Sequence, residues 1–471
     1  MNKDIYQPYL TYIANYWNQI ILKPQRFKLG NRILQRVVMR IPKKNYNIID
    51  VPNTCLVPNT SFYRYIFYWD SYFMFRGLLG TSKEWVIPEM VDNFIYIFNK
   101  YHIIPNFSHP EALGRSQAPF LTSMIFDAYR VLHTNHNISY QLQKPQHLIV
   151  NKKLWLKKRI KIAIQEYQDV WESPMDADHQ HYNHKVADYN LNRYGDRDVG
   201  YGHHAEQESG WDMTSRFYNR CDDFLPVDLN CFLYKYEIDF ARAAEIFGNM
   251  EEKTMWEEKA AKRKDRINTY MWSEAKGFYF DYDYIHKTQS HFVSLAGFVP
   301  LWTGIATRTQ AQRVIEKLSL FQTKFGLAIT DKASLPPKID TSKVAEPFKI
   351  TIDEVLKPKQ WDYPNIWPPL HYLTVIGLLR YDFVNEAKKL MQEYLDANMQ
   401  AFDKYGAMLE KMDGLTGDMP PKYWYPTQLG FGWTNAIFYR YINILDELEN
   451  NTAIFKEPLP ATPPYALNFI H

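Results

Sequence analysis

Apolar residues recur at helical spacing along most of the chain. Between residues 88 and 101, for example, Met90, Val91, Phe94 and Ile97 fall on one face of a helix. The same spacing predicts further helices over residues 117–132, 152–170, 227–248, 252–271, 309–320, 369–380, 385–400 and 432–448. Proline-containing loops separate these segments, and the period-two alternation that is typical of strands is scarce. The pattern therefore predicts a large all-α fold.

The order of these helices fits two arrangements, a closed ring of helical hairpins around a central pit or an open solenoid. We find no clean repeat, which argues against the common solenoids. No Gly/Ser linker divides the chain, so one domain is expected over residues 1–471. The polar segment 176–210 is too long for an ordinary connection, and we expect it to form a functional lid loop.

Charge and composition exclude some classes of function. The 471 residues carry 55 Lys and Arg against 52 Asp and Glu, a net charge of +3, which predicts no nucleic-acid partner. The N-terminus lacks the pattern of a signal peptide, and the longest mostly apolar run, 292–306, is too short to cross a bilayer. We therefore expect a cytoplasmic protein with no membrane partner. Cys55, Cys221 and Cys231 are expected to be reduced core residues.

Aromatic residues make up 16% of the chain, and this is its most unusual compositional feature. One interpretation is a large core combined with a compositional bias. The other is carbohydrate binding, because the apolar faces of sugar rings stack on indole and phenol rings. Several short segments combine these rings with acids and amides, and they favour the second interpretation.

The first two segments supply candidate hydrogen-bonding groups. In SFYRYIFYWDSYFMF, Trp69 and Asp70 lie in a dense aromatic patch. An Asp among so many rings needs partners to offset its desolvation, and sugar hydroxyls are suitable donors; the alternative is a helix cap. In IIPNFSHPEALGRSQAPF, Asn106, Arg115 and Gln117 could all bind hydroxyls, although a capped loop would also explain them.

The segment HHAEQESGWDMTSRF supplies a candidate acid. Glu208 and Asp212 lie four residues apart, and Gly210 allows a close approach of the backbone. A carboxyl group beside Trp211 in an apolar setting would have a raised pKa, which suits a general acid. The alternative is an acidic first turn favoured by a helix dipole.

The last segments are QWDYPNIWPPL, AMLEKMDG and YPTQLGFGWTN. Gln360, Trp361 and Asp362 precede a proline-rich helix start, where turn chemistry is the alternative explanation. Glu410 follows an apolar pair, and Phe431 lies beside a glycine in an expected sharp turn. By spacing alone, Glu410 is one carboxylate among 52 acidic residues.

Together these segments resemble the motifs of the trehalase family, in family order, between about residues 59 and 440. ESGWDMTSRF resembles the second family signature, and PVDLNCFLYKYEIDFA resembles the stretch that follows it. QWDYPNIWPPL, QLGFGWTN and the block ending in RSQAPF resemble three further motifs. The resemblance implies an (α/α)6 barrel, with its motif-bearing core over residues 59–440. It also implies an inverting glycoside hydrolase that needs no cofactor and no metal.

The resemblance assigns a role to each matching residue. Asp212 is expected to be the general acid, and Glu410, in the EKMD stretch, the general base. Substrate contacts are expected from Trp69, Asp70, Asn106, Arg115, Gln117 and Trp361, with Trp211 and Phe431 as further aromatic contacts. In an inverting enzyme the two catalytic carboxyls lie roughly 6.5–9.5 Å apart, so that a water molecule fits between them and the sugar. The expected partner is a small carbohydrate, most simply α,α-trehalose, and the oligomeric state stays open.

The chain departs from the family pattern in loops expected on the leaving-group side. The glycines of the first signature are absent, Arg64 is only a candidate for its arginine, and Trp424 stands where a lid glutamate is usual. The alternative substrates are therefore a glucosylglycerate, a mannosylglycerate or another short α-glucoside. The carboxylate of a glycosylglycerate could pair with one of Arg64, Arg115, Arg193, Arg197, His203 or His204.

Two other classes of function stay open. A metal site could form from His179, His181 and His184 with Asp176 and Asp178, although we expect these side chains to be solvated. A catalytically inactive sugar-binding protein is the other alternative. The presence of both Asp212 and Glu410 argues against it.

Overall fold

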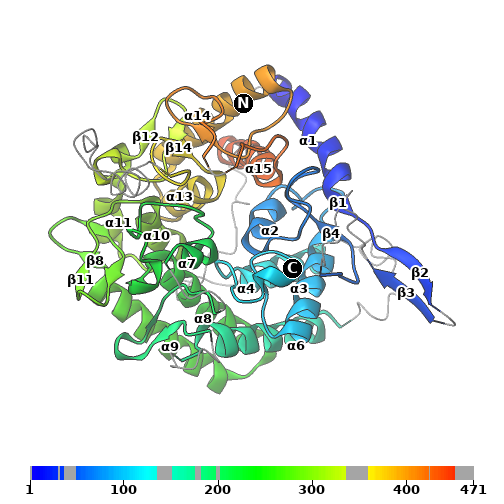
Figure 1. Cartoon of the computed structure of the whole chain (residues 1–471), viewed down its shortest axis with the longest axis horizontal. Coiled ribbons are helices and arrows are strands. Elements are labelled where there is room, and N and C mark those ends of the chain that lie inside the picture. Colours follow the sequence, from blue (N-terminus) through cyan, green and yellow to red (C-terminus); the bar gives the residue numbers. More distant parts are fainter. Residues whose placement is uncertain are drawn as a thin grey trace, which may run out of the picture.

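The computed structural model of the chain describes residues 3–29, 32–36, 49–134, 151–174, 182–197, 202–335, 359–423 and 425–450. Helices of this described part surround a common centre (Figure 1). The inner ring contains α2 (Tyr68–Phe75), α4 (Leu121–Thr134), α8 (Val227–Phe247), α10 (Val299–Thr303), α13 (Pro368–Arg380) and α15 (Gly432–Glu449). Each of these helices contacts the next, and α15 contacts α2 again. The ring is therefore closed, as one of the two predicted arrangements requires.

A second helix accompanies each member of the inner ring. The outer helices are α1 (Gln7–Ile20), α3 (Val86–Tyr101), α6 (Lys152–Glu166), α9 (Met250–Tyr270), α11 (Arg308–Ile315) and α14 (Val384–Tyr405). Outer and inner helices alternate along the chain, so each outer helix runs back along the outside of the ring (Figure 1). This is the architecture of an (α/α)6 barrel, and the predicted fold class is confirmed.

Burial explains which helices are inside. Along α13, every residue from Pro368 to Leu379 is buried, as expected for a helix that is covered on all sides. Along α9, the buried residues are Trp256, Ala260, Arg263 and Ile267, which repeat every three or four positions. That spacing gives one inward stripe and a solvated outer face.

Short antiparallel strands occur only in the connections of the described part. They are β1 (Ile21–Leu22) with β4 (Cys55–Leu56), β2 (Gln25–Leu29) with β3 (Arg32–Arg36), β5 (Lys185–Val186) with β6 (Leu191–Asn192), β8 (Trp272–Ser273) with β9 (Phe278–Tyr279), β12 (Gln322–Thr323) with β13 (Gly326–Leu327), and the three-stranded set β7 (Phe224–Leu225), β10 (Tyr282–Asp283) and β11 (Thr288–Gln289). Another pair, β14 (Asn365–Ile366) and β15 (Met412–Asp413), joins two loops beside the ring, with Asn365 opposite Asp413.

The expectation that segment 176–210 is one continuous loop was wrong. Residues 185–186 and 191–192 pair as strands, and α7 (Gly202–Ser209) is a helix. Residues 176–181 and 198–201 of this segment lie outside the described ranges. Periodicity did not indicate α7 because Glu206 and Glu208, two carboxyls, occupy fully buried positions on it. The buried carboxylates of Glu206 and Glu208 accept hydrogen bonds from the backbone N–H groups of Thr214 and Ser116.

Two further expectations can be checked against the described residues. Cys55, Cys221 and Cys231 are buried and unpaired, as predicted for core cysteines. Among the helices that the structure describes, none combines the length and the apolar character needed to cross a membrane.

Candidate active site

A pocket lies where the loops that precede the inner helices come together. Its lining consists of Tyr63, Phe67, Trp69, Asp70, Asn106, Gln117, Gly210, Asp212, Trp361, Trp367, Glu410, Tyr425, Phe431 and Trp433. The empty space between them is about 370 Å³, counting the part open to solvent, within the range of small-molecule sites. Eight of the ten predicted site residues are in this lining. The ring therefore gathers residues that lie far apart in the sequence.

The position of Asp212 depends on a tight loop between α7 and α8. Gly210 has a positive φ of 80°, and a Cβ there would lie 2.6 Å from the indole of Trp69. Glycine is thus required both by conformation and by the close approach of Trp69. After Asp212, the buried carboxylate of Asp362 accepts hydrogen bonds from the backbone N–H of Ser215 at 2.9 Å and from its hydroxyl at 2.7 Å. These contacts hold the acid in place from both sides.

The same loop is tied to the barrel wall through Arg216. Its guanidinium is fully buried and pairs with Asp228 at 2.7 Å and with Asp281 at 2.7 Å. Asp228 lies on the inner helix α8, and Asp281 lies between β9 and β10. Arg216 also stacks over the ring of Trp211, 4.6 Å from its centroid. The loop that carries Asp212 is therefore fixed to two separate elements.

Asp212 has the environment of an acid that keeps its proton. Burial raises the pKa of its carboxyl to about 7; the charge of Arg115 opposes this rise, and the Glu410 carboxylate adds to it. A carboxyl group with a pKa near neutrality can donate a proton at the pH of the cell. The expectation of a raised pKa beside Trp211 agrees with this direction.

Glu410 has three donors that favour its ionised form. The hydroxyl of Tyr425 donates to Oε1 at 3.0 Å. The backbone N–H of Gln428 and the ammonium of Lys411 donate to Oε2, at 3.2 and 3.3 Å. Burial raises the pKa of Glu410, and these donors, Lys411 first, oppose the rise. Such a carboxylate is suited to accept a proton from water.

A third carboxyl, Asp70, lies in the first turn of α2 and lines the same pocket. Burial raises its pKa well above the usual range, and the negative charge of Asp212 adds to the effect. The neighbouring backbone N–H of Trp69 donates to Oε1 of Gln117 at 2.9 Å. The amide of Asn106 donates to the carbonyl of Gln207 at 2.6 Å. These two amides therefore align the segments that bear Asp70 and Asp212.

Stacked aromatic rings form one wall of the pocket. Trp361 and Trp367 are parallel with centroids 3.9 Å apart, and Trp69 lies 5.8 Å from Trp361. Phe431 and Trp433 continue this wall at the start of α15, with centroids 4.5 Å apart. Flat apolar faces of this kind match the faces of a pyranose ring and exclude bulk water.

Two predicted site residues lie outside the lining. Arg115 pairs with Asp196 at 3.0 Å, and its charge reaches Asp212 through space rather than by contact. Trp211 is fully buried behind the wall, stacked on Trp361 at 5.7 Å. Neither residue is part of the lining, and their contact with the substrate stays a prediction.

Glu208, which sequence spacing paired with Asp212, has a structural role. One of its oxygens accepts from the backbone N–H of Ser116 at 2.7 Å, and the other accepts from Gly195 and from Nε2 of His184, both at 2.7 Å. His184 is buried, so the expectation that it is solvated was wrong. The remaining members of the proposed metal cluster, 176, 178, 179 and 181, lie outside the described residues. Among those described, no group of acids, histidines and cysteines has metal-binding geometry.

The proposed carboxylate-binding cations do not line the pocket where they are described. Arg193 donates to the carbonyls of Asn183 and Asp222, at 2.9 and 2.8 Å, and so serves the loop structure. Arg197 lies over the ring of Tyr182 at 4.9 Å, and Arg64 is half-buried outside the lining. The side chains of 203 and 204, and the whole of 424, lie outside the described part.

Sequence reasoning missed five aromatic lining residues and the lysine beside Glu410. All five lie inside segments that were singled out, namely Tyr63, Phe67, Trp367, Tyr425 and Trp433. An aromatic residue gives the same sequence signal in a core as in a sugar site. Lys411 follows Glu410 directly, and its burial could not be read from its neighbours.

Comparisons with known proteins agree with this geometry. The Trehalase family model matches residues 28–446. A cytosolic neutral trehalase of Kluyveromyces lactis is 30% identical over 430 residues, 79% of this chain. The chain spans about half of that relative's length, 54%. The solved structure of a neutral trehalase from Saccharomyces cerevisiae has a TM-score of 0.69 and 25% identity, covering 94% of this chain and 81% of the other.

A more distant solved structure shares the fold alone. A mannosylglycerate hydrolase of Thermus thermophilus has a TM-score of 0.57 and 15% identity, covering 82% of this chain and 95% of the other. With motifs, barrel and pocket in agreement with a family match over most of its length, the chain belongs to the trehalase family.

Proposed function

We propose that this protein hydrolyses α,α-trehalose to glucose with inversion of configuration. The observation that carries the proposal is the joint presence of Asp212 and Glu410 in one aromatic-walled pocket. The named relatives are neutral trehalases, one of them cytosolic, and we extend both their reaction and that location to this chain.

In the proposed reaction, one glucosyl unit lies against the tryptophan wall, with its glycosidic oxygen beside Asp212. Asp212 donates its proton to that oxygen as the bond to the anomeric carbon breaks. Glu410 removes a proton from a water molecule, which attacks the opposite face of the sugar. The aromatic rings exclude bulk water from the pocket. The electrostatic interactions that act on each proton transfer are therefore screened less than they would be in water.

The charge of the pocket favours a neutral leaving group. Its described lining contains three carboxyl groups, Asp70, Asp212 and Glu410, and no arginine, lysine or histidine. The carboxylate of a glycosylglycerate would add a further negative charge without a partner in that lining. A second sugar, with hydroxyls only, avoids this repulsion. Trehalose therefore fits better than the anionic alternatives.

The first test determines whether turnover requires Asp212 and Glu410 but not other acidic residues. Asp212→Asn and Glu410→Gln should each lower kcat by about 10²-fold or more, because each removes a proton-transfer group. Sugar binding, measured by titration calorimetry, should survive in both variants. Asp265→Asn and Glu251→Gln, at exposed positions of α9, serve as matched controls and should remain fully active. Near-normal turnover of Asp212→Asn would remove the acid assignment.

The second test distinguishes the stereochemistry and the substrate. Proton NMR of the first products of trehalose should show α- and β-glucose in equal amounts, since only the attacked unit inverts. Exclusive α-glucose would contradict the inverting scheme. The same assay on glucosylglycerate and mannosylglycerate should give little turnover, and a preference for either over trehalose would contradict the charge argument.

A further inference from the structure

Lys411 is a buried lysine that the proposed reaction leaves without a task. Its side chain has no exposed surface. An ammonium group at such a position needs several favourable contacts to offset its desolvation. The contacts of the Lys411 ammonium therefore indicate its role in the structure.

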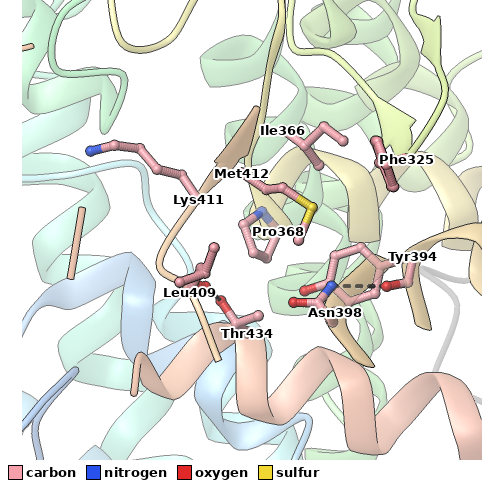
Figure 2. A pocket seen from close by; sticks show the side chains of 9 residues that line it. All are labelled: Phe325, Ile366, Pro368, Tyr394, Asn398, Leu409, Lys411, Met412 and Thr434. Atoms are coloured by element: carbon pink, nitrogen blue, oxygen red, sulfur yellow. Dashed lines mark hydrogen bonds between the residues drawn. The ribbon is translucent and has the colours of Figure 1, made fainter. Parts of the chain in front are cut away.

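The two ends of Lys411 face different parts of the molecule. Its stem borders a second pocket, whose empty space is about 230 Å³ counting the part open to solvent and which is lined also by Phe325, Ile366, Pro368, Tyr394, Asn398, Leu409, Met412 and Thr434 (Figure 2). Figure 2 shows the ammonium directed away from that pocket, while Met412 and Tyr394 project into it. Lys411 thus spans the wall between the second pocket and the active pocket, with its charge on the side of the active pocket.

On that side the ammonium is enclosed by Glu410 and three other groups. It donates to Oε2 of Glu410 at 3.3 Å and to Oε1 of Gln360 at 3.1 Å. It also lies over the rings of Tyr425 and Trp367, 4.0 and 4.7 Å from their centroids. The two rings confine the ammonium without supplying a competing negative charge.

Gln360 connects this arrangement to the acid. Its amide nitrogen donates to the backbone carbonyl of Asp212, and its amide oxygen accepts from Lys411. The chain of contacts Asp212–Gln360–Lys411–Glu410 therefore runs from the backbone of the proposed acid to the carboxylate of the proposed base. A displacement of Lys411 would disturb the spacing between them.

The two oxygens of Glu410 are used unequally. Oε2 accepts from Lys411 and from the backbone of Gln428, whereas Oε1 accepts from the hydroxyl of Tyr425. The other carboxyl groups of the pocket are Asp212 and Asp70, whose pKa values are both raised by burial, and Tyr63 lies beside Tyr425. Among the described residues, Lys411 is the cationic side chain that contacts Glu410. Its charge lowers the pKa of Glu410 against the effect of burial.

We propose that Lys411 is a positioning residue that keeps Glu410 ionised and directs its Oε1 toward the attacking water. It does so by contacting Oε2 while Gln360 fixes its ammonium relative to Asp212. The proposal rests on the role of Glu410 as general base. In this proposal, contact with Lys411 is the reason why Glu410 is ionised while Asp212, in the same pocket, keeps its proton.

The test compares Lys411→Met with Lys411→Arg across the pH profile of kcat/KM for trehalose. Methionine keeps the length and packing of the stem but removes the charge. It should move the acidic limb to higher pH by about one unit or more, because an opposite charge at this range favours the ionised carboxyl by that amount. Activity on that limb then falls about tenfold, in proportion to the ionised fraction. Arginine should keep the limb near its wild-type position.

Lys235→Met is the matched control. Lys235 is also buried and pairs with a carboxylate, Asp239, at 2.5 Å, but it lies on α8 outside the pocket lining. This variant should lose thermal stability without moving the acidic limb. If Lys411→Met lowers stability and leaves the limb in place, as Lys235→Met does, Lys411 is merely structural and the proposal fails.

A second measurement keeps the proposal independent of trehalose turnover. Thermal unfolding of wild type, Lys411→Met, Glu410→Gln and the double variant gives the coupling between the two side chains. We expect a favourable coupling at neutral pH that disappears as the pH falls and Glu410 takes up a proton. Zero coupling at all pH values would overturn the assignment of Lys411. Coupling without turnover of any glycoside would instead overturn the proposed function.

Discussion

At the scale of the residue, two glycines with the same backbone conformation have different surroundings. Gly210 and Gly248 both have a φ of 80°. A Cβ on Gly248 would meet nothing within 4 Å, whereas one on Gly210 would lie 2.6 Å from the Trp69 ring. The pair therefore separates the cost of conformation from the cost of crowding the site.

Alanine at these two positions should give different results. Gly248→Ala should lower stability by about 1–2 kcal/mol, the cost of a left-handed residue with a side chain, with unchanged kcat/KM. Gly210→Ala should add to this a loss of about tenfold or more in kcat/KM, because Trp69 must move and the loop of Asp212 with it. Denaturant unfolding and trehalose kinetics measure both. Equal kinetics for the two variants would contradict the close approach at Gly210.

Phe62 is an exposed ring at the edge of the pocket. It is 58% exposed and lies parallel to Tyr425, with centroids 6.3 Å apart. It also belongs to the segment in which the first family signature is altered. A ring at this place can stack on the leaving sugar.

Phe62→Ala should therefore raise KM for trehalose about two- to tenfold with little change in kcat, as expected for the loss of one stacking contact. Leu320→Ala, at another exposed apolar residue that is not part of the lining, is the control. An unchanged KM in the Phe62 variant would show that this ring does not contact the substrate.

At this scale, motifs predicted more of the site than spacing alone did. Glu410 could not be distinguished from other acids by its neighbours, and only the resemblance of EKMD to a family motif indicated it. Arg115 and Trp211 belong to the same motifs, yet they are not part of the lining. A motif shows which residues occur together. It does not show in which direction each side chain points, and that direction decides whether the residue lines the pocket.

At the scale of the element, the outer helix α9 contacts the ring through a narrow stripe of buried side chains. Trp256 is buried on α9 and packs against Phe240 and Tyr167, at centroid distances of 4.7 and 5.8 Å. Its neighbour Met255 is 49% exposed. The two residues thus represent the two faces of one helix.

Trp256→Ala should lower the free energy of unfolding by about 3–5 kcal/mol, because it leaves a large cavity between α9 and the barrel. Met255→Ala should change it by no more than about 0.5 kcal/mol. Urea unfolding followed by circular dichroism measures both, and the active pocket should be unaffected in each. A small effect at Trp256 would mean that α9 is held mainly by other contacts.

Sequence periodicity predicted most of the long helices but missed the 14-residue α1 and the short buried helices. All nine predicted helical segments overlap helices of the structure, with ends that differ by a few residues. The inner helix α2 was missed because all eight of its residues are buried, so it has no polar face to give a period. The helix α7 was missed for the opposite reason, since its buried groups include carboxylates.

At the scale of the whole molecule, closure of the ring joins distant parts of the sequence. The backbone of Gly77 approaches Ala436 so closely that a Cβ would lie 2.5 Å from its Cα. Since every inner helix contacts two others, no described part of the ring can open without exposing its neighbours. This supports the prediction of one domain over the chain.

Differential scanning calorimetry should accordingly show a single transition whose calorimetric and van't Hoff enthalpies agree. Trp256→Ala should shift this whole transition to lower temperature, although it changes only one outer helix. Two separated transitions, with one alone sensitive to Trp256, would contradict the single-domain prediction.

Closure also has a consequence for the order of synthesis. The ribosome releases Asp212 long before Glu410, and at roughly 5–20 residues per second their separation corresponds to roughly 10–40 s. Phe431 and Trp433, which complete the aromatic wall, come still later, at the start of α15. A nascent chain therefore carries the acid without the base and cannot cleave sugar. The proposed hydrolysis therefore requires that α15, the last helix of the described part, has reached α2.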